Sequence, residues 1–236
     1  MFERAHHQRI ARVLEALDAE LLLKNRCLFG GGTAIALAHG EYRESADIDF
    51  ICSSVDGYRE LRNLVNKGGV EALLNTPLAP LRPPRIDQYG IRCAFGIDQL
   101  PVKFEIVFEG RVVLADPGPQ DRICGVWTLA LQDQVVTKLM ANSDRWADDA
   151  VMSRDLIDLS MLSDSGLLLA EGVAKAKRAY GDSISADFAK ARQHLLGRDG
   201  RLERCMKAMG ITLSAPELRA RIDRLRLAAG RRAKRT

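Results

Sequence analysis

The sequence lacks long hydrophobic runs and paired cysteines, and both absences exclude classes of protein. No apolar run approaches the roughly 20 residues that a membrane-spanning helix needs, so we expect no membrane association. The five cysteines form no Cys-x-x-Cys pair, which excludes the usual zinc and thioredoxin-type motifs. The first ten residues, MFERAHHQRI, are too polar for a signal peptide. We therefore expect a cytoplasmic protein whose thiols are free.

Composition and charge indicate a folded protein with a basic C-terminal end. The chain has 236 residues, of which 47% are hydrophobic and 28% charged, as in globular proteins of one large or two small domains. Residues 201–236 carry 11 Lys and Arg against 3 Asp and Glu, whereas the residues before them carry 24 against 28. This asymmetry favours a polyanionic partner; the alternative is a solvated helix face and a frayed tail.

The predicted elements change from mixed to helical along the chain. Apolar alternation predicts strands at 27–29, 46–52, 89–95, 102–108 and 111–115. Helical periodicity predicts helices at 4–23, 34–39 and 58–67, then only helices at 128–144, 150–163, 167–179, 184–196, 200–209 and 214–228. His6 and His7, on the first helix, are expected to face solvent. The pattern predicts an α+β fold, with a mixed domain in residues 1–120 and a helical domain in residues 121–236.

Three acidic residues on two predicted strands suggest a site for divalent cations. Asp47 and Asp49 are two positions apart on one strand, so both carboxylates project from the same face. Glu105 alternates with Phe104 and Ile106 on a later strand and joins the aspartates if the two strands are neighbours. Hard oxygen ligands select Mg²⁺ or Mn²⁺. Three carboxylates on adjacent strands are the arrangement that two-metal phosphoryl transfer requires.

A glycine run precedes the acidic pair and predicts a phosphate-binding turn. Gly30, Gly31 and Gly32 allow a ligand to approach the backbone closely. Thr33 is a suitable N-cap for the next helix, whose first N–H groups would then face a phosphate. A glycine run alone is often a simple turn, and an Asp-x-Asp pair alone is often a solvated loop. Their order, from strand through GGGT and helix to an Asp-x-Asp strand, is much more specific.

Together these motifs resemble the AbiEii/AbiGii toxin family of nucleotidyltransferases, in the DNA polymerase β-like superfamily. Gly31, Gly32 and Thr33 match the glycine loop of the superfamily, and the two aspartates match its Asp-x-Asp pair. The third acidic position holds Glu105, where Asp is commoner. The resemblance implies a nucleotidyltransferase-type mixed sheet with flanking helices, followed by an all-helical C-terminal domain.

Further segments extend the resemblance over residues 27–160. Arg43 and Ser45 match the family pattern Arg-x-Ser-x-Asp-x-Asp. The segments Lys138-Leu-Met-Ala-Asn-Ser-Asp-Arg145 and Arg154-Asp155-Leu-Ile-Asp158-Leu159 match two later family motifs. A lysine at 138 could reach a triphosphate as a point charge. Asp155 and Asp158 share one helix face and could hold that lysine. The alternatives are an exposed lysine and two surface salt bridges.

The resemblance implies an enzyme that transfers NMP from an NTP to an acceptor hydroxyl and releases pyrophosphate. It implies Mg²⁺ or Mn²⁺ bound by Asp47, Asp49 and Glu105, and a toxin whose acceptor is a tRNA 3′ end or a protein side chain. An antitoxin encoded nearby is the implied partner. The basic C-terminal end, including Arg219, Arg221, Arg224, Arg226 and Arg231–Arg235, favours RNA. A transferase acting on a small molecule such as an antibiotic, and a degenerate fold that only binds, are the alternatives.

Overall fold

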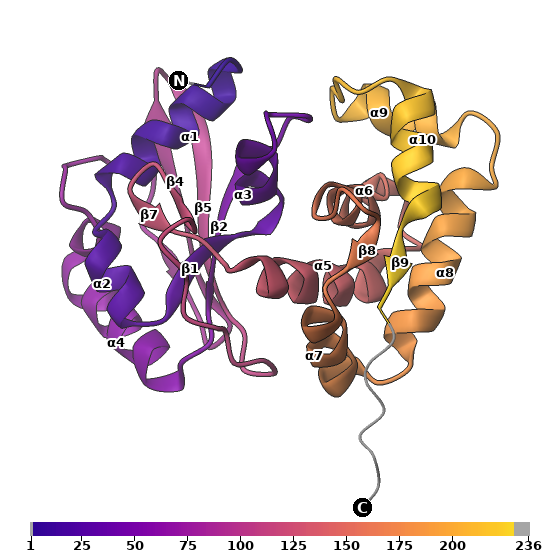
Figure 1. The fold of residues 1–236 in the computed structure, drawn as a ribbon. Helices are drawn as coiled ribbons and strands as arrows, with labels where there is room; N and C mark the ends of the chain where they lie inside the picture. The colour runs from indigo at the N-terminus through magenta and orange to yellow at the C-terminus, as the bar shows by residue number, and fades with distance from the viewer. Residues whose placement is uncertain (1, 229–236) are drawn as a thin grey trace, which may run out of the picture. The chain divides into compact units, whose positions relative to one another are not determined.

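The computed structural model describes residues 2–228 and divides into two compact units, with the division between Ala130 and Leu131. The first unit contains a mixed sheet with helices and the second is largely helical, which confirms the α+β fold class (Figure 1). No helix within residues 2–228 is long and apolar enough to cross a membrane. The cluster Arg231–Arg235 lies outside the described residues.

A five-stranded sheet forms the centre of the first unit. Its strands are β1 (Cys27–Gly30), β2 (Asp47–Cys52), β3 (Arg85–Ile86), β4 (Gly90–Ile97) and β5 (Leu100–Phe108). They follow the order β1–β2–β5–β4–β3, in which β2 and β5 are parallel and all other neighbours are antiparallel. The two strands that carry the acidic residues are therefore direct neighbours, as their proposed joint site requires.

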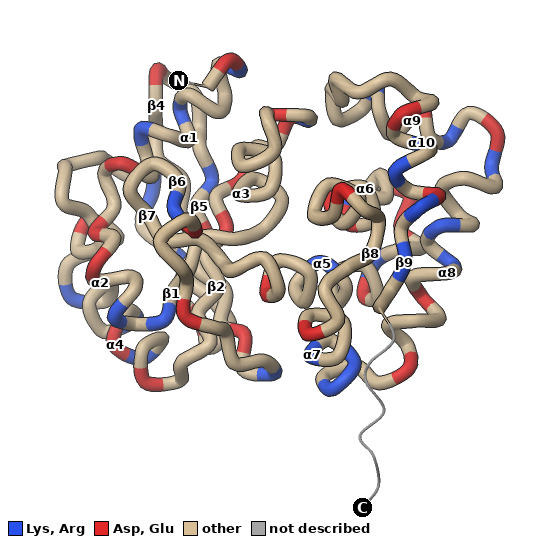
Figure 2. Tube along the Cα trace, in the orientation of Figure 1, with Lys and Arg blue, Asp and Glu red and all other residues tan. Residues whose placement is uncertain are grey.

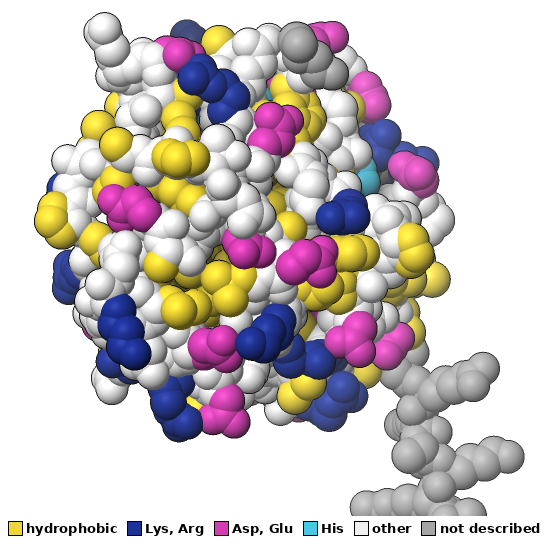
Figure 3. All heavy atoms as spheres, turned by 90° about the vertical axis from the view of Figure 1, so that its left-hand side faces the viewer, with side chains coloured by type: hydrophobic (Ala, Val, Ile, Leu, Met, Phe, Trp, Pro, Cys, Tyr) yellow, Lys and Arg dark blue, Asp and Glu magenta, His cyan; other side chains and the backbone are white. Residues whose placement is uncertain are grey.

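Three helices of the first unit pack apolar side chains against one face of the sheet. They are α1 (Ala5–Ala16), α2 (Ala19–Lys24) and α4 (Val55–Gly68), followed by a 3₁₀ turn at Val70–Leu73. Within this core the rings of Phe50 and Phe104 lie 5.7 Å apart between centroids. Figure 3 shows the helical side, where acidic and basic side chains are interspersed with hydrophobic ones. Because Ile48 and Phe50 enter the core, Asp47 and Asp49 project from the opposite face.

Two predictions for the first unit are wrong, and tertiary contacts explain both. The predicted helix over 4–23 breaks at Leu17, whose backbone is extended and pairs with Leu74, and Asp18 then caps α2. The predicted strand over 111–115 is irregular. Its apolar alternation is present, but Leu114 donates its N–H to the Ser53 hydroxyl rather than to a strand. Apolar alternation predicts which side chains are buried, but a strand also needs a neighbouring strand to which its backbone can hydrogen-bond.

A further short element ends the first unit. β6 (Arg122–Ile123) and β7 (Val126–Trp127) form a hairpin whose turn places Cys124 and Gly125 at positive φ. The next residues pair with β1, since Thr128 bridges Phe29 and the Leu129 N–H donates to the Phe29 carbonyl. These contacts attach the segment after β7 to the edge of the sheet.

The second unit is built around α5 (Leu131–Arg145), which packs against α6 (Arg154–Met161), α7 (Ala170–Tyr180) and α8 (Ser183–Leu196). It continues with α9 (Arg201–Ala208) and α10 (Ala215–Arg224). Two differences from the predicted helices occur. The predicted helix over 150–163 is a 3₁₀ turn at Asp149–Val151 and then α6, because Met152 and Ser153 adopt positive φ. The unit is also not purely helical, since β8 (Leu167–Leu168) and β9 (Arg226–Leu227) pair in parallel.

Candidate active site

A row of five residues, one from each strand, crosses the open face of the sheet, and four of them are charged. The register places Gly30 of β1 opposite Asp49, Asp49 opposite Glu105, Glu105 opposite Arg92, and Arg92 opposite Arg85. Residues opposite one another in neighbouring strands lie on the same face, about 5 Å apart. The row therefore runs from two carboxylates to two guanidinium groups. Sequence reasoning missed both arginines, because Arg85 lies outside the predicted strands and the hairpin that pairs Arg92 with Glu105 was not recognised.

A hollow of about 540 Å³ lies over this row in the first unit. It is also lined by Asp47, by Lys103, which stands opposite Asp47 in the register, and by Arg82 in the loop before β3. All three carboxylates that the sequence singles out thus line one hollow, together with four basic side chains. A hollow of this charge pattern suits a ligand that carries phosphates and divalent cations.

Two of the carboxylates have basic partners within the hollow. Lys103 Nζ lies 3.5 Å from Asp47 Oδ1, and Arg92 Nε lies 2.6 Å from Glu105 Oε1. Arg92 also donates to Asp87 Oδ2 at 3.0 Å. These cations offset the repulsion that three neighbouring carboxylates would otherwise experience.

The donor set fits a divalent cation in its chemistry and in its place on adjacent strands, although the side chains do not converge on one point. Asp47, Asp49 and Glu105 offer hard oxygen ligands on adjacent strands, and the aspartate and glutamate side chains are partly exposed to the hollow. As the side chains stand, residues 2–228 contain no group of three acidic, histidine or cysteine side chains converged to hold a metal ion. The basic partners Lys103 and Arg92 would have to share or release the carboxylates when a metal binds.

The start of α3 (Gly31–Ala38) lies directly against the acidic pair. Gly31 has φ of +68°, and a Cβ added there would lie 2.5 Å from Asp49 Oδ2. The predicted N-cap at Thr33 is wrong, because α3 begins three residues earlier than predicted and its N-cap is Gly30. The Thr33 hydroxyl instead donates to the Asp47 carbonyl at 2.5 Å and lies 2.8 Å from Ser45 Oγ. Thr33 therefore ties the first turn of α3 to the start of β2.

Gly31→Ala should reduce catalysis in addition to the loss of stability that any glycine at positive φ shows on this change. Positive φ costs an L residue about 1–2 kcal/mol, but the new Cβ would also displace the Asp49 carboxylate. We expect transfer to fall about 10²-fold, on the scale of a 1 Å misplacement, as measured by kcat and by thermal unfolding. Gly181→Ala is the matched control, since Gly181 has the same φ and no described atom lies within 4 Å of its added Cβ. Equal activity of the two variants would contradict this role of Gly31.

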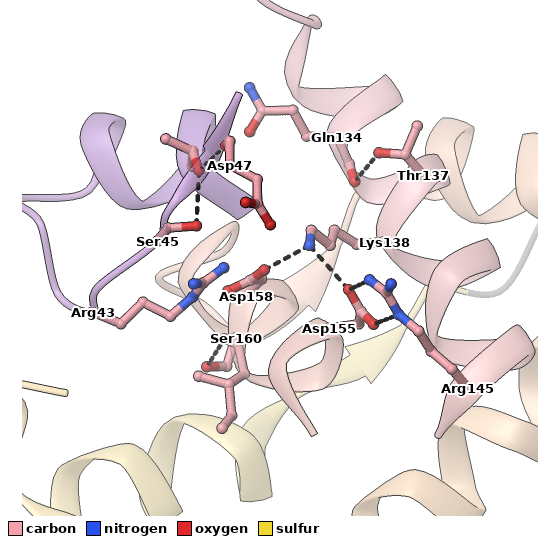
Figure 4. A network of polar contacts seen from close by, with 12 residues as sticks. Arg43, Ser45, Asp47, Gln134, Thr137, Lys138, Arg145, Asp155, Asp158 and Ser160 are labelled. Carbon is pink, nitrogen blue, oxygen red and sulfur yellow. Dashed lines mark hydrogen bonds and ion pairs between the residues drawn. The ribbon is translucent and has the colours of Figure 1, made fainter. Parts of the chain in front are cut away.

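The second unit contains a buried cluster of charged residues from α5 and α6. Lys138 Nζ lies 3.0 Å from Asp155 Oδ1 and 2.7 Å from Asp158 Oδ2, and Arg145 Nε lies 2.6 Å from Asp155 Oδ2 (Figure 4). The Lys138 side chain is 6% exposed, so the alternatives of an exposed lysine and surface salt bridges are wrong. Burial opposes ionisation of Asp155, but Lys138 and Arg145 overcome it and hold the pKa of that carboxyl well below its usual value.

Other predicted site residues are distributed as follows. Arg43 is buried and donates to the Glu44 carbonyl, and Ser45 contacts Thr33. Figure 2 shows basic residues along α10 and β9 of the second unit. Of these, Arg221 lies 3.6 Å from both Asp164 and Glu217, whereas Arg226 donates to the Leu225 carbonyl. Some arginines of this basic surface thus already form ion pairs or hydrogen bonds with other residues of the chain.

Comparison with models of known protein families identifies the relatives of this chain. The model of the AbiEii nucleotidyl transferase toxins of type IV toxin–antitoxin systems matches residues 12–228. The chain belongs to this family. The AbiEii match confirms the resemblance drawn from the motifs and extends it through the helical unit. The AbiEii-family chain is thus a nucleotidyltransferase enzyme and a toxin of a type IV system, which implies an antitoxin partner.

Solved structures share the AbiEii-family fold at low sequence identity. The chain is similar to MenT4, a nucleotidyltransferase toxin from Mycobacterium tuberculosis H37Rv, with 18% identity, a TM-score of 0.50 and coverage of 94% of this chain and 84% of that one. It is similar to a candidate nucleotidyltransferase from H. pylori, with 15% identity, a TM-score of 0.53 and coverage of 94% and 92%. JHP933 from Helicobacter pylori has 14% identity, a TM-score of 0.50 and coverage of 94% and 90%. These likenesses show the fold alone. A search of curated proteins finds no match.

Proposed function

We propose that this AbiEii-family enzyme transfers NMP from an NTP to a hydroxyl at an RNA end in a metal-dependent reaction. The observation that carries the proposal is the row of Asp49, Glu105, Arg92 and Arg85 in one hollow with Asp47. Carboxylates suit the cations of a metal–triphosphate complex, and guanidinium groups suit the phosphates of a nucleic acid. An acceptor without phosphates would leave the triphosphate of the NTP as the anion for these arginines, so the RNA acceptor is tested through KM for RNA and KM for NTP separately.

Asp47, Asp49 and Glu105 are the residues that would hold Mg²⁺ or Mn²⁺. When bound, the metal ions would activate the attacking hydroxyl oxygen and neutralise the charge of the triphosphate. The first N–H groups of α3, from Gly31, Gly32 and Thr33, would donate to phosphate oxygens, because a helix N-terminus favours anions. Arg43 and Ser45 are assigned to the nucleotide by their place in the family motif.

Lys138 is assigned to the triphosphate, with Asp155 and Asp158 as the residues that orient it. An ammonium group has three N–H donors, and two of them are directed at these aspartates. The third is the donor that we assign to a phosphate oxygen as charge develops on the leaving pyrophosphate.

Arg82 and Arg85 provide the test of the RNA acceptor. Both are exposed at the hollow and, within residues 2–228, neither has a carboxylate in ion-pair contact. The double variant Arg82→Ala, Arg85→Ala should raise KM for RNA about tenfold and leave KM for NTP within about twofold. Each lost phosphate contact should also lower the salt dependence of RNA binding by about 0.7 in the logarithmic slope.

The experiment compares transfer of α-labelled NTP to total RNA and to protein at several salt concentrations. Arg59→Ala is the matched control, because this exposed arginine pairs with Asp56 on α4, on the other side of the sheet. Label in RNA with a flatter salt slope for the double variant supports the proposal. Label in protein alone, or in a small molecule, would assign the alternative acceptor, and an unchanged slope would remove the arginines from RNA binding.

A further inference from the structure

The residues at the start of α1, from Glu3 to His7, bind the segment of residues 41–46, which leads directly into the acidic strand. The N–H groups of Glu3 and Arg4 donate to the Glu41 carboxylate at 2.6 and 3.1 Å, and Arg4 Nε donates to the Glu41 carbonyl at 3.1 Å. His6 Nε2 lies 2.9 Å from the Ala46 carbonyl. The first N–H groups of a helix usually donate to the side chain of its N-cap residue, but the N-cap of α1 is Arg4, whose side chain makes no such bond. The carboxylate of Glu41, from a distant segment, accepts these N–H groups instead.

His7 is central to this contact and is wholly buried, so the prediction that it faces solvent is wrong. Its Nδ1 lies 2.7 Å from Glu41 Oε1, and its Nε2 lies 3.2 Å from the Ser45 nitrogen. Because the Ser45 N–H can only donate, Nε2 is the acceptor and Nδ1 carries the proton that is donated to Glu41. Burial favours this neutral imidazole and lowers the pKa of His7.

The contact continues from Ser45 to the acidic strand. Ser45 Oγ lies 2.8 Å from Thr33 Oγ1, and Thr33 Oγ1 donates to the Asp47 carbonyl at 2.5 Å. Glu41 adopts φ of +52°, a conformation that a non-glycine residue keeps only when its surroundings hold it. A hydrogen-bonded chain thus runs from Glu41 through His7, Ser45 and Thr33 to the backbone of Asp47.

We propose that His7 is a positioning residue for nucleotidyl transfer, which fixes the segment before Asp47 through its bond to the Ser45 N–H. The inference rests on the proposed function, since it takes Asp47 as part of the reacting site. It assigns the two ring nitrogens different tasks. Nδ1 anchors the imidazole to Glu41, and Nε2 sets the backbone that carries the acidic pair.

Two amide substitutions separate these tasks. The Asn side chain places its amide near Nδ1, so His7→Asn keeps a donor for Glu41 and loses the acceptor for Ser45. The longer Gln side chain places its amide near Nε2, so His7→Gln keeps an acceptor for Ser45 and loses the donor for Glu41. We expect His7→Asn to lower kcat about 10²-fold, the scale of a misplaced reacting group. We expect His7→Gln to stay within about threefold of wild type while unfolding at a lower temperature.

The measurement is kcat and KM for NTP, with thermal unfolding and hydrogen exchange of residues 41–49 for each variant. A lower kcat and faster exchange in His7→Asn than in His7→Gln support the proposal. Equal kcat values, or values that follow only the unfolding temperature, would overturn it. Arg12→Ala is the control on the same helix, because it removes only an exposed ion pair to Asp98. If wild type transfers no nucleotide, the proposed function fails, while equal exchange in the two variants separately refutes the role of Nε2.

A milder variant covers the case in which His7→Asn does not fold. His6 is only partly buried, so His6→Ala should fold, and it removes the bond to the Ala46 carbonyl. We expect kcat to fall about threefold to tenfold with no change in unfolding temperature. Full activity of His6→Ala together with an unfolded His7→Asn would assign this end of α1 to stability alone and overturn the proposal.

Discussion

Asp49→Asn should reduce nucleotidyl transfer by at least about 10³-fold and leave the fold intact. The amide has the shape of the carboxylate but neither its charge nor its affinity for hard cations, so the electrostatic stabilisation of the transferring phosphoryl group is lost. Stability should be kept or slightly raised, because Asp49 stands opposite Glu105 and the change removes a like-charge repulsion. Single-turnover rates, thermal unfolding and Mn²⁺ binding in the presence of NTP measure these effects.

Asp98→Asn is the matched control for this substitution. Asp98 is an exposed aspartate between β4 and β5, and its charge pairs with Arg12, away from the hollow. This variant should transfer nucleotide and bind Mn²⁺ as wild type does. If Asp49→Asn kept full activity, the acidic pair would not be the reacting site, whatever the other residues of the row contribute.

Lys138→Ala should show two separate losses, one in stability and one in catalysis. Removal of the ammonium leaves Asp155 and Asp158 as buried carboxylates, and breaking a buried pair costs about 3–5 kcal/mol of unfolding free energy. Loss of a transition-state electrostatic contact should lower turnover of the folded protein by about 10²-fold or more. Lys138→Arg should rescue turnover poorly, since the guanidinium is broader and differently hydrated.

A double variant distinguishes the two losses. Lys138→Met with Asp158→Asn removes one charge of each sign and leaves Asp155 paired with Arg145. Most of the stability should return, because the remaining buried charges are balanced, while turnover should stay low. Recovery of turnover together with stability would show that Lys138 acts only in the packing of α5 against α6.

The sequence was sufficient to predict how the two acidic strands orient their side chains. Alternation places Asp47 and Asp49 on one face and Ile48 and Phe50 in the core, as the structure has them. It could not predict that β2 lies beside β5, because Asp49 and Glu105 are far apart in the chain. Arg92 faces Glu105 across the local β4–β5 hairpin, so the tight turn at Asp98 and Gln99 is the signal that could have placed it in the site.

The burial of His7 could have been predicted from its spacing in the sequence. His7 lies three residues before Ile10 and seven before Leu14, on the apolar face of α1, and this spacing favours burial. Its partners could not be predicted, since Glu41 and Ser45 are 34 and 38 residues away. The spacing of Asp155 and Asp158 likewise indicated a shared helix face. Their common contact with Lys138 depends on how α6 packs against α5.

The most direct test of the account follows the phosphorus atoms of the NTP. Wild-type protein is incubated with Mg²⁺, total RNA and NTP labelled at either the α or the γ position, and Asp49→Asn is treated in parallel. RNA should gain the α label, the γ label should leave as pyrophosphate, and Asp49→Asn should give neither product. Transfer of the γ label to an acceptor, or equal α labelling by Asp49→Asn, would contradict nucleotidyl transfer at this acidic pair.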